Sequence, residues 1–406
     1  MQKPASLLLF SVALLCDVPC RADVVEKVNA LALATAAPPG SNVALRTLVV
    51  ANLAMFDAAN AITPRYTSYR VPPAPPANAS PDAVALAAGC AAIAEFHPQQ
   101  RAATAKSCDE IAAALPAGAM TDDARRFGET VARDLVATRR DDGLGAPNRY
   151  VPATSAGVYV PTVFPVGYDV ATTKPFALTS ASQFRPGPPP ALDGATWARD
   201  YNEIKSLGAR DSTTRSAVQT TTAQFWGSTG FQQFNDAMAD NAVPESAGTV
   251  PRARHYALVY MSLFDAAIAH FDAKYTYGFW RPVTAIRNGQ LGGNAATQPD
   301  LAWLPLIDAP MHPEYPCAHC NSAAVFAGIL VGLRGTERRT LIVRAAASFT
   351  PRNATREYPT EAELVADAVN ARVWSGIHFR NSAETGAAMG RQIARYMLST
   401  QLRPLP

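Results

Sequence analysis

Apolar residues recur at spacings of three and four along most of this chain, which is the period of amphipathic helices. Alternation of apolar and polar residues, the pattern of a half-buried strand, is confined to runs at 150–153 and 157–161. Thr121 and Ser382 are expected to begin helices, because short polar side chains cap free backbone N–H groups. The pattern therefore predicts an all-helical (all-α) protein of two packed helical bundles with long proline-rich loops. The expected helical segments are 41–62, 82–95, 106–116, 122–138, 246–273, 319–333 and 361–375.

One apolar motif occurs twice, each time inside a long predicted helix. Residues 53–59 resemble residues 261–267, and the two runs share Phe-Asp-Ala-Ala. Such an echo is expected where two bundles are built from similar helices, although four shared letters also arise by chance in an alanine-rich chain. We interpret Asp57 and Asp265 inside these runs as paired core carboxylates or struts between helices, not as catalytic acids.

Prolines cluster at 72–76 and between 147 and 190. The longer stretch carries Tyr159, Phe164 and Tyr168, which we expect to anchor it as an ordered wrap or lid. It also marks the expected boundary between two helical halves. The predicted domains are a signal peptide at 1–22, an N-terminal helical half with the proline-rich wrap at 23–195, and a C-terminal helical bundle at 196–406.

The first 22 residues have the pattern of an export signal. Lys3 precedes the apolar run 7–15, and residues 20–22 form a small-residue cleavage site. The run is too short to cross a bilayer, and we expect no membrane span in the rest of the chain. The protein is therefore predicted to be exported, to the periplasm or beyond.

Export changes the interpretation of the cysteines. Of six, four remain after cleavage at residue 22, and an oxidising compartment favours disulfides. Cys90 and Cys108 form a sensible pair between neighbouring helical segments. Cys317 and Cys320 are left over, and they flank His319.

The composition excludes few classes of function. The chain has 406 residues, 48% hydrophobic and 17% charged, which is enough for a large core. The net charge is +3 and no run of Lys and Arg occurs, so nucleic acid is not an expected partner.

Three segments near the C-terminus together suit a pocket for a tetrahedral oxyanion such as phosphate or vanadate. They are 274–282, 316–320 and 372–378, and they contribute two arginines, a lysine and two histidines. Guanidinium groups bind such oxygens in a fork, and lysine adds a point charge. The alternative is a set of solvated charges, but aromatic neighbours in the first segment argue for burial.

Each segment has local features that fit this chemistry. Lys274 and Arg281 are seven residues apart, so they could share a helix face, and the following Pro282 predicts a bend or a new helix. His319 stands at a predicted helix start, where free N–H groups favour an anion, although a lone histidine is more often structural. Arg372 and His378 bracket a glycine that would allow close approach of backbone or ligand.

The ordered trio resembles the vanadium-dependent haloperoxidases and the related acid and phosphatidic acid phosphatases. Their motifs are Lys-six residues-Arg-Pro, then Pro-Ser-Gly-His, then Ser-Arg-x-x-x-Gly-x-His. The likeness to the secreted bacterial haloperoxidase-like branch spans roughly residues 40 to 400. It includes the runs 46–62, 225–230, 312–316 and 374–380.

The resemblance implies a role for each matching residue. His378 would ligate vanadium, as the axial ligand, and His319 would be the acid–base group. Lys274, Arg281 and Arg372 would bind the vanadate oxygens, together with Cys317 and Ala318 at the serine and glycine positions. The implied activity is peroxide-driven oxidation of a halide, with hydrogen peroxide, a halide and a small organic substrate as partners. We also allow for a homodimer.

The chain departs from the family pattern around the second motif. Cys317 replaces a serine, Ala318 a glycine and Ala371 another serine, and Ser382 stands where some members carry an aspartate. A thiol donates only a weak hydrogen bond. The Cys317-x-x-Cys320 pair could be a disulfide, or reduced and open to oxidation.

Three alternatives therefore stay open. One is a phosphatase with His378 as nucleophile, with phosphate in place of vanadate. A second is a thiol-redox protein or a zinc or copper site built from the two cysteines, His319 and His312. The third is a binding protein without turnover. Glu314 could reach the pocket and tune His319, but a loop-capping role is the plainer interpretation. The histidines interpreted as structural are His97, His255 and His270.

Overall fold

The computed structural model describes residues 23–36, 41–227, 230–335, 339–345 and 354–406, so the predicted signal peptide lies outside the described part. The fold is helical with one short hairpin, which confirms the predicted class. The first group of elements is α1 (Val24–Thr35), α2 (Asn42–Ile62), α3 (Pro81–Phe96), α4 (Arg101–Ala112), α5 (Asp122–Ala137) and α6 (Tyr168–Ala171), with a 3-10 turn at Pro98–Gln100. The next is α7 (Ala195–Leu207), α8 (Ala217–Phe225), α9 (Gly230–Asp236), α10 (Met238–Asn241), α11 (Thr249–Tyr277) and α12 (Pro282–Arg287), with 3-10 turns at Glu245–Ala247 and Gly289–Gly292. The last is α13 (Ala318–Arg334), β1 (Leu341–Arg344), β2 (Thr355–Tyr358), α14 (Glu361–Trp374) and α15 (Arg380–Thr400).

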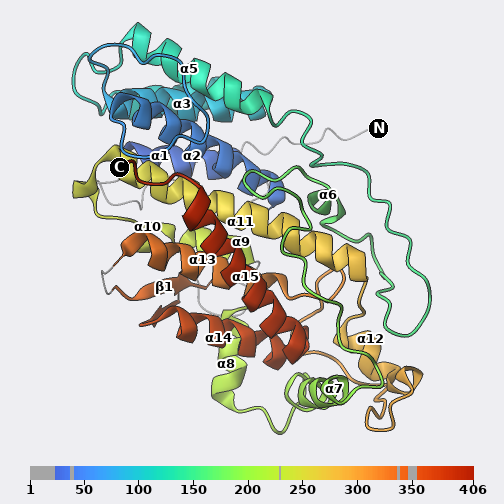
Figure 1. Ribbon diagram of the computed structural model, residues 1–406. Coiled ribbons are helices and arrows are strands. Elements are labelled where there is room, and N and C mark those ends of the chain that lie inside the picture. Colours follow the sequence, from blue (N-terminus) through green and yellow to red (C-terminus); the bar gives the residue numbers. More distant parts are fainter. Residues whose placement is uncertain (1–22, 37–40, 228–229, 336–338, 346–353) are drawn as a thin grey trace, which may run out of the picture.

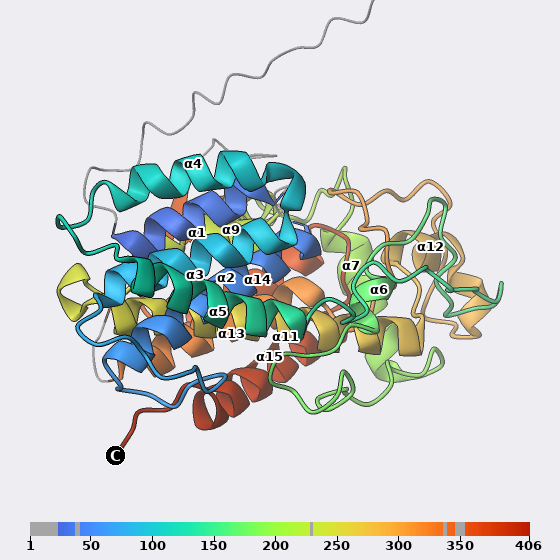
Figure 2. The same cartoon turned by 90° about the horizontal axis from the view of Figure 1, so that it is seen from above.

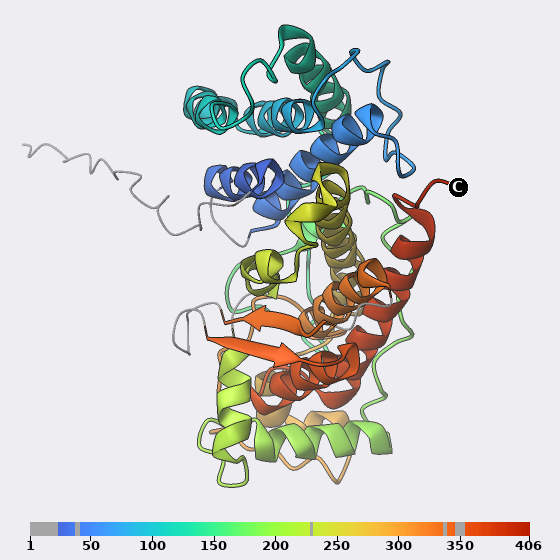
Figure 3. The same ribbon diagram turned by 90° about the vertical axis from the view of Figure 1, so that its left-hand side faces the viewer.

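Helix α11 lies between two groups of helices (Figures 1 and 3). On one side α1 to α5 pack together, and α2 rests directly on α11. On the other side α13 packs against α11, α14 and α15, beside the antiparallel hairpin. Seen from above, α6, α7 and α12 gather at one end of the molecule (Figure 2). The C-terminal end of α11 reaches this end, so its last turn is placed among several loops.

Most of the predicted helices occur close to their expected bounds, and the differences have physical reasons. The segment 106–116 is shifted, because α4 begins at Arg101, directly after the 3-10 turn. Helices α1 and α6 to α10 and the hairpin were not predicted as elements, and of α15 only a start at Ser382 was predicted. The two predicted strand runs are not strands; within them, only Val158 pairs with another segment, through an isolated bridge to Phe279. Thr121 caps α5 as expected, whereas α15 begins at Arg380, two residues before Ser382.

The two aspartates of the repeated motif bind backbone, not each other. Asp265 in α11 accepts the N–H groups of Phe176, Ala177 and Leu178 at 2.7–2.9 Å. Asp57 in α2 accepts two backbone N–H groups in the same way, from residues 69 and 70. Each carboxylate therefore fastens an extended segment to a core helix, which fits a structural role and corrects the predicted pairing.

The proline-rich wrap is ordered, but only two of its three expected anchors are anchors. Tyr159 is buried and its backbone N–H bonds the carbonyl oxygen of Gly278 at 2.7 Å. Tyr168 packs edge-on against Tyr275. Phe164 is 75% exposed, so the prediction for that residue is wrong.

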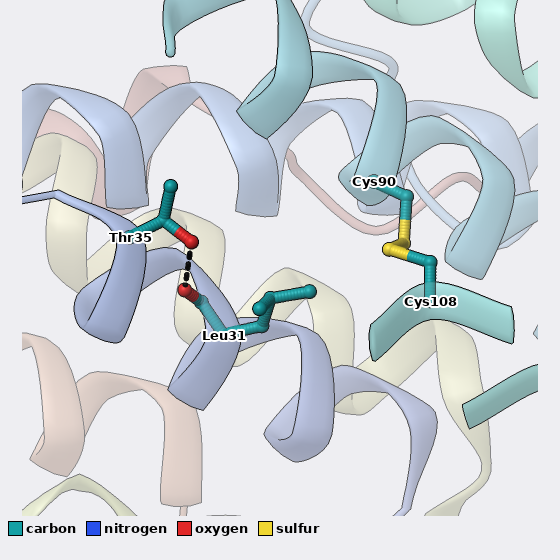
Figure 4. The surroundings of a disulfide bond; sticks show 4 residues. All are labelled: Leu31, Thr35, Cys90 and Cys108. Carbon is teal, nitrogen blue, oxygen red and sulfur yellow. Dashed lines mark hydrogen bonds between the residues drawn. A yellow bond between two sulfur atoms is a disulfide. The ribbon is translucent and has the colours of Figure 1, made fainter. Parts of the chain in front are cut away.

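Cys90 and Cys108 lie at disulfide-bonding distance, with 2.01 Å between the sulfurs, and join α3 to α4 (Figure 4). Their neighbour α1 ends beside them, where the Thr35 hydroxyl donates to the Leu31 carbonyl oxygen at 2.8 Å. This is the pairing expected from the sequence.

One helix of the described part, α2, is long and apolar enough to cross a membrane by length and composition. From the sequence we expected no such segment beyond residue 22. The apolar window of α2 is 83% buried inside the fold, as befits the central helix of its group.

We predict that Asp265→Asn lowers the free energy of unfolding by about 3 kcal/mol, because an amide NH2 would face backbone donors that now bind a carboxylate. Urea denaturation measures the change. The control is Asp308→Asn at a side chain that is 97% exposed, where almost no change is expected. Equal stabilities for the two variants would contradict the fastening role.

Candidate oxyanion site

The first segment of the site is a helix end followed by a new helix. Helix α11 ends at Tyr277 because Gly278 adopts a left-handed conformation, with φ of 54°, and α12 begins at Pro282. Lys274 and Arg281 therefore do not share a face of one helix, which corrects that expectation. Both side chains nevertheless bind the loop at 312–314. Lys274 Nζ donates to the carbonyl oxygens of Pro313 and Glu314 at 2.9 and 2.8 Å.

Arg281 binds the same loop from the other direction. Its Nε donates to the carbonyl oxygen of His312 at 2.9 Å, and one terminal nitrogen donates to that of Ile377, also at 2.9 Å. Both cations are buried, at 0% exposure for Lys274 and 2% for Arg281. The flanking Phe279 and Trp280 belong to a second apolar cluster, so the expected burial is confirmed.

The second segment forms the start of α13. Cys317 is the N-cap residue, Ala318 is the first helical residue and His319 the second. Cys317 is also tied to α15, because its N–H bonds the carbonyl oxygen of Ser382 at 3.1 Å. The turn therefore presents helix N–H groups close to the third segment.

The spacing of the third segment follows from a helix end. Gly376 has φ of 79°, and this left-handed residue lets the His378 N–H bond back to the Arg372 carbonyl oxygen at 3.3 Å. A Cβ at Gly376 would lie 2.4 Å from the carbonyl oxygen of Gly208. The glycine is therefore needed for close approach of this backbone, and not of a ligand. The two functional side chains of this segment are thus fixed by one turn.

Glu314 holds the imidazole of His378. The His378 Nδ1 lies 2.8 Å from Glu314 Oε1, and both side chains are buried. The N–H of Phe379 donates to the same oxygen at 3.1 Å. A proton on Nδ1 leaves Nε2 as an acceptor, and Arg281 lies 3.3 Å from Nε2 as its donor. Of the two roles considered for Glu314, contact with His319 is not seen, because the carboxylate binds His378 instead. Its bond to the Phe379 N–H is close to the loop-capping role that was the plainer interpretation.

A cavity of about 620 Å³ opens beside these groups. Its wall includes Ala318, His319, Arg372 and His378 of the predicted site. Lys274, Arg281 and Cys317 are not in the wall. These three residues lie behind the cavity wall. The structure therefore brings the seven predicted residues into one region, with four in the wall and three behind it.

Two further histidines belong to this cavity, His270 and His312. His270 was interpreted as structural, yet it precedes Lys274 by four residues in the same helix. That spacing was the available signal, because side chains four apart share a helix face. His312 contacts Arg281 at 2.9 Å. The other two structural histidines, His97 and His255, are not in the cavity wall.

His319 is held by a polar contact and by rings. Its Nε2 lies 3.3 Å from Gln233 Oε1, and Trp226 and Phe234 pack against the imidazole edge-on. Burial, reinforced by the charge of Arg372, holds the pKa of His319 well below its usual range. The imidazole is therefore neutral at neutral pH.

The site carries an excess of buried positive charge. Among the described residues, Lys274, Arg281 and Arg372 bind carbonyl oxygens or imidazoles and none pairs with a carboxylate. Burial lowers the pKa of Arg281 to about 10, and burial with the charge of Arg281 holds that of Lys274 well below its usual range. Arg372 Nε is buried without a partner. Such a group needs an anion, and an oxyanion fits beside it.

The two cysteines are free thiols, both fully buried. They do not build the zinc or copper site that was considered. His312 binds Arg281 and His319 lies against Gln233, and the described residues contain no cluster of three His, Cys, Asp or Glu side chains that could hold a metal ion. Of the two roles considered for the cysteine pair, thiol-redox chemistry is therefore the one left.

We predict that inorganic phosphate stabilises the protein, because an anion offsets the repulsion among three buried cations. At a concentration of 100 times Kd, the gain is about 2.7 kcal/mol. Thermal unfolding with and without phosphate measures it. Arg372→Ala should abolish the gain, whereas Arg210→Ala, at a side chain 53% exposed, should retain it. A wild-type protein insensitive to millimolar phosphate would rule out an anion site.

Comparison with known proteins supplies a domain match and a fold. Residues 254–404, which contain all seven predicted site residues, match the VCPO second helical-bundle domain. A bacterial vanadium-dependent iodoperoxidase is similar to this chain, with a TM-score of 0.76 and 20% identity over 94% of this chain and 96% of that one. The holo and apo forms of a bacterial vanadium-dependent chloroperoxidase each give a TM-score of 0.67, at 17% and 18% identity. They cover 88% of this chain and 91% and 92% of theirs.

No curated protein matches the chain. The family resemblance recognised in the three motifs is nevertheless confirmed by the domain match and by the shared architecture. The chain has the fold of the vanadium haloperoxidases, and its residues 254–404 match the VCPO second helical-bundle domain.

Proposed function

We propose that this protein is a vanadium-dependent haloperoxidase that uses hydrogen peroxide to oxidise a halide. The observation that carries the proposal is the convergence of three unpaired buried cations with two neutral histidines that border one cavity. The fold supports it, since similar architectures belong to vanadium-dependent iodoperoxidase and chloroperoxidase. We further propose that the protein is exported and acts outside the cytoplasm.

The residues present fit vanadate. Vanadate, when bound, supplies a Lewis-acidic centre at which peroxide becomes reactive toward halide. Lys274, Arg281 and Arg372 would hold its oxygens, and the buried, unpartnered Nε of Arg372 is the plainest sign of a missing anion. The start of α13 adds the backbone N–H groups of residues 318 and 319.

His378 has the protonation state that a metal ligand needs. Glu314 accepts from Nδ1, so Nε2 carries the lone pair, and the ring cannot rotate without losing this bond. That lone pair now accepts the 3.3 Å contact from Arg281 and would ligate the metal in its place. Burial, together with the charges of Arg281 and Lys274, holds the pKa of His378 well below its usual range. The ring therefore stays neutral, and its Nε2 remains a donor of electrons to a metal.

His319 is placed for proton transfer. If its Nε2 donates to Gln233, its Nδ1 is the acceptor. That atom can take the proton that hydrogen peroxide loses on binding. It can later return the proton to the oxygen of the hypohalous product. The aromatic neighbours Trp226 and Phe234 limit water around the ring.

The remaining wall of the cavity suits an organic acceptor of the oxidised halogen. Phe231, Phe271, Ile307 and Met311 contribute apolar surface next to the histidines. An apolar or aromatic small molecule would therefore be preferred over a charged one.

The test is oxidation of iodide and bromide by the mature protein in the presence of orthovanadate and hydrogen peroxide. Activity is expected in the wild type and should be absent from His378→Ala. His319→Ala should retain vanadate binding and lose about 100-fold or more of kcat. Vanadate affinity is followed separately by the thermal shift, so loss of binding is distinguished from loss of turnover.

The same preparations should be tested for hydrolysis of p-nitrophenyl phosphate. Ester hydrolysis that vanadate inhibits, without any halide oxidation, would overturn the proposal in favour of the phosphatase alternative. Cys317→Ser serves as a control for the unusual second motif, because it restores the hydroxyl that the family carries there.

A second prediction concerns Glu314, which we propose as a positioning residue. It stands in for the aspartate that some family members carry at the Ser382 position, since Glu314 and Ser382 border the same small cavity. Glu314→Gln should lower vanadate affinity by about 10- to 100-fold, as losses of groups that orient metal ligands do.

The discriminating variant is the double change Glu314→Gln with Ser382→Asp, which moves the carboxylate to residue 382 in the wall of the same small cavity. It should recover most of the vanadate affinity measured by thermal shift. Ser382→Asp alone should not improve on the wild type. A double variant as weak as Glu314→Gln would show that the carboxylate does not act by holding His378.

A further inference from the structure

The start of α13 contains two thiols in a specific arrangement. Cys317 is the N-cap residue and its Sγ accepts the N–H of Cys320 at 3.1 Å. Both side chains are reduced in the structure and fully buried. The Cys317 sulfur caps the helix as a serine hydroxyl could, and Cys320 brings a second sulfur within one helical turn.

Three features that make a thiol reactive coincide here. Cys317 lies at a helix N-terminus, belongs to a Cys-x-x-Cys pair, and has cations close by. Those cations are Arg372 and Lys274, which stabilise a thiolate on Cys317. Cys320, one turn inside the helix, is surrounded by apolar helix packing. The pair is therefore unequal, with Cys317 as the nucleophile and Cys320 as its resolving partner.

Sulfur chemistry supports the same division of roles. Burial raises the pKa of Cys317, but the hydrogen bond from Cys320 and the charges of Arg372 and Lys274 outweigh it and bring the pKa to about 7. Burial and the neighbouring Cys317 raise the pKa of Cys320 well above its usual range. Attack thus begins at Cys317.

We propose that Cys317 and Cys320 are a redox-active dithiol that hydrogen peroxide oxidises to a disulfide, and that this oxidation tightens oxyanion binding in the adjacent site. The first half stands on the position of the two sulfurs at the start of α13, and the nearby positive charges support it. The second half rests on the oxyanion site of the proposed function.

The oxidation balances in two steps. The Cys317 thiolate attacks one oxygen of hydrogen peroxide, the O–O bond breaks, hydroxide leaves and Cys317 becomes a sulfenic acid. The Cys320 sulfur then attacks the Cys317 sulfur, the S–O bond breaks and water leaves. Two thiols and one peroxide give one disulfide and two waters. A small dithiol such as dithiothreitol reverses the reaction by thiol–disulfide exchange.

The effect on oxyanion binding follows from charge. In the reduced pair, a thiolate on Cys317 occupies the field of Arg372 and Lys274, and it repels a second anion there. A disulfide is neutral, so those cations become available to the oxyanion. The hydrogen-bond donor lost with the thiol is a weak one, so the charge effect decides the direction. The disulfide also protects both sulfurs from irreversible oxidation.

The first experiment follows the sulfurs by mass spectrometry. The reduced mature protein is treated with stoichiometric peroxide, denatured, alkylated and digested. The peptide spanning 317–320 should lose two alkylation sites and carry an internal disulfide, and dithiothreitol should restore both sites. Cys320→Ser should stop at a sulfenic acid that dimedone traps on Cys317, and Cys317→Ser should leave Cys320 unmodified.

Two results would overturn the dithiol. In one, both thiols remain alkylatable after excess peroxide. In the other, Cys317 proceeds to the sulfonic acid in the wild type without disulfide formation. Neither result depends on a variant that might not fold, because both are read in the wild-type protein. The distant Cys90–Cys108 pair, mapped in the same digest, serves as the internal reference.

The second experiment measures inorganic phosphate binding to the reduced and the disulfide forms by calorimetry. Phosphate replaces vanadate as the probe because thiols reduce vanadate. The disulfide form should bind about tenfold more tightly, which corresponds to about 1.4 kcal/mol. Equal or weaker binding by the disulfide form would refute the coupling. Absence of phosphate binding in both forms would instead count against the proposed oxyanion site, leaving the sulfur result intact.

Discussion

Glu314 connects the segments of the site, because both its side chain and its backbone form hydrogen bonds to them. Its carboxylate fixes His378 and the N–H of Phe379, while its carbonyl oxygen accepts the Lys274 ammonium. Its own N–H bonds the Phe279 carbonyl oxygen at 2.8 Å. A buried carboxylate in a group of buried cations is costly to place, and burial raises the pKa of Glu314 to about 7. The hydrogen bonds offset that cost only in this one arrangement, which is why the geometry is specific.

The positive charge left over explains why the site suits an anion. Three cations are held in place by carbonyl oxygens, which compensate a charge only in part. The same field acts on the histidines, which stay neutral, and on the Cys317 sulfur, which gains thiolate character. The metal ligation, proton transfer and sulfur reactivity that we propose would thus all follow from one electrostatic arrangement.

The repeated motif shows how the surrounding scaffold is built. Asp57 and Asp265 occupy equivalent places in α2 and α11, which pack on each other, and each fastens an extended segment. In α11 that fastening holds the wrap close to the helix whose last turn carries Lys274. The chain therefore uses the same device in both groups of helices, but only the C-terminal group continues into a site.

What the sequence determined by itself was the helical class, most of the long helices and the membership of the seven site residues in one set. Helical periodicity and the ordered motifs are local, so they can be recognised without a fold. The tertiary structure alone decided that Glu314 contacts His378, that His270 and His312 border the cavity, and that Phe164 faces solvent. These outcomes depend on which loops meet at the end of α11, and contacts between residues tens of positions apart leave no periodic trace in the chain.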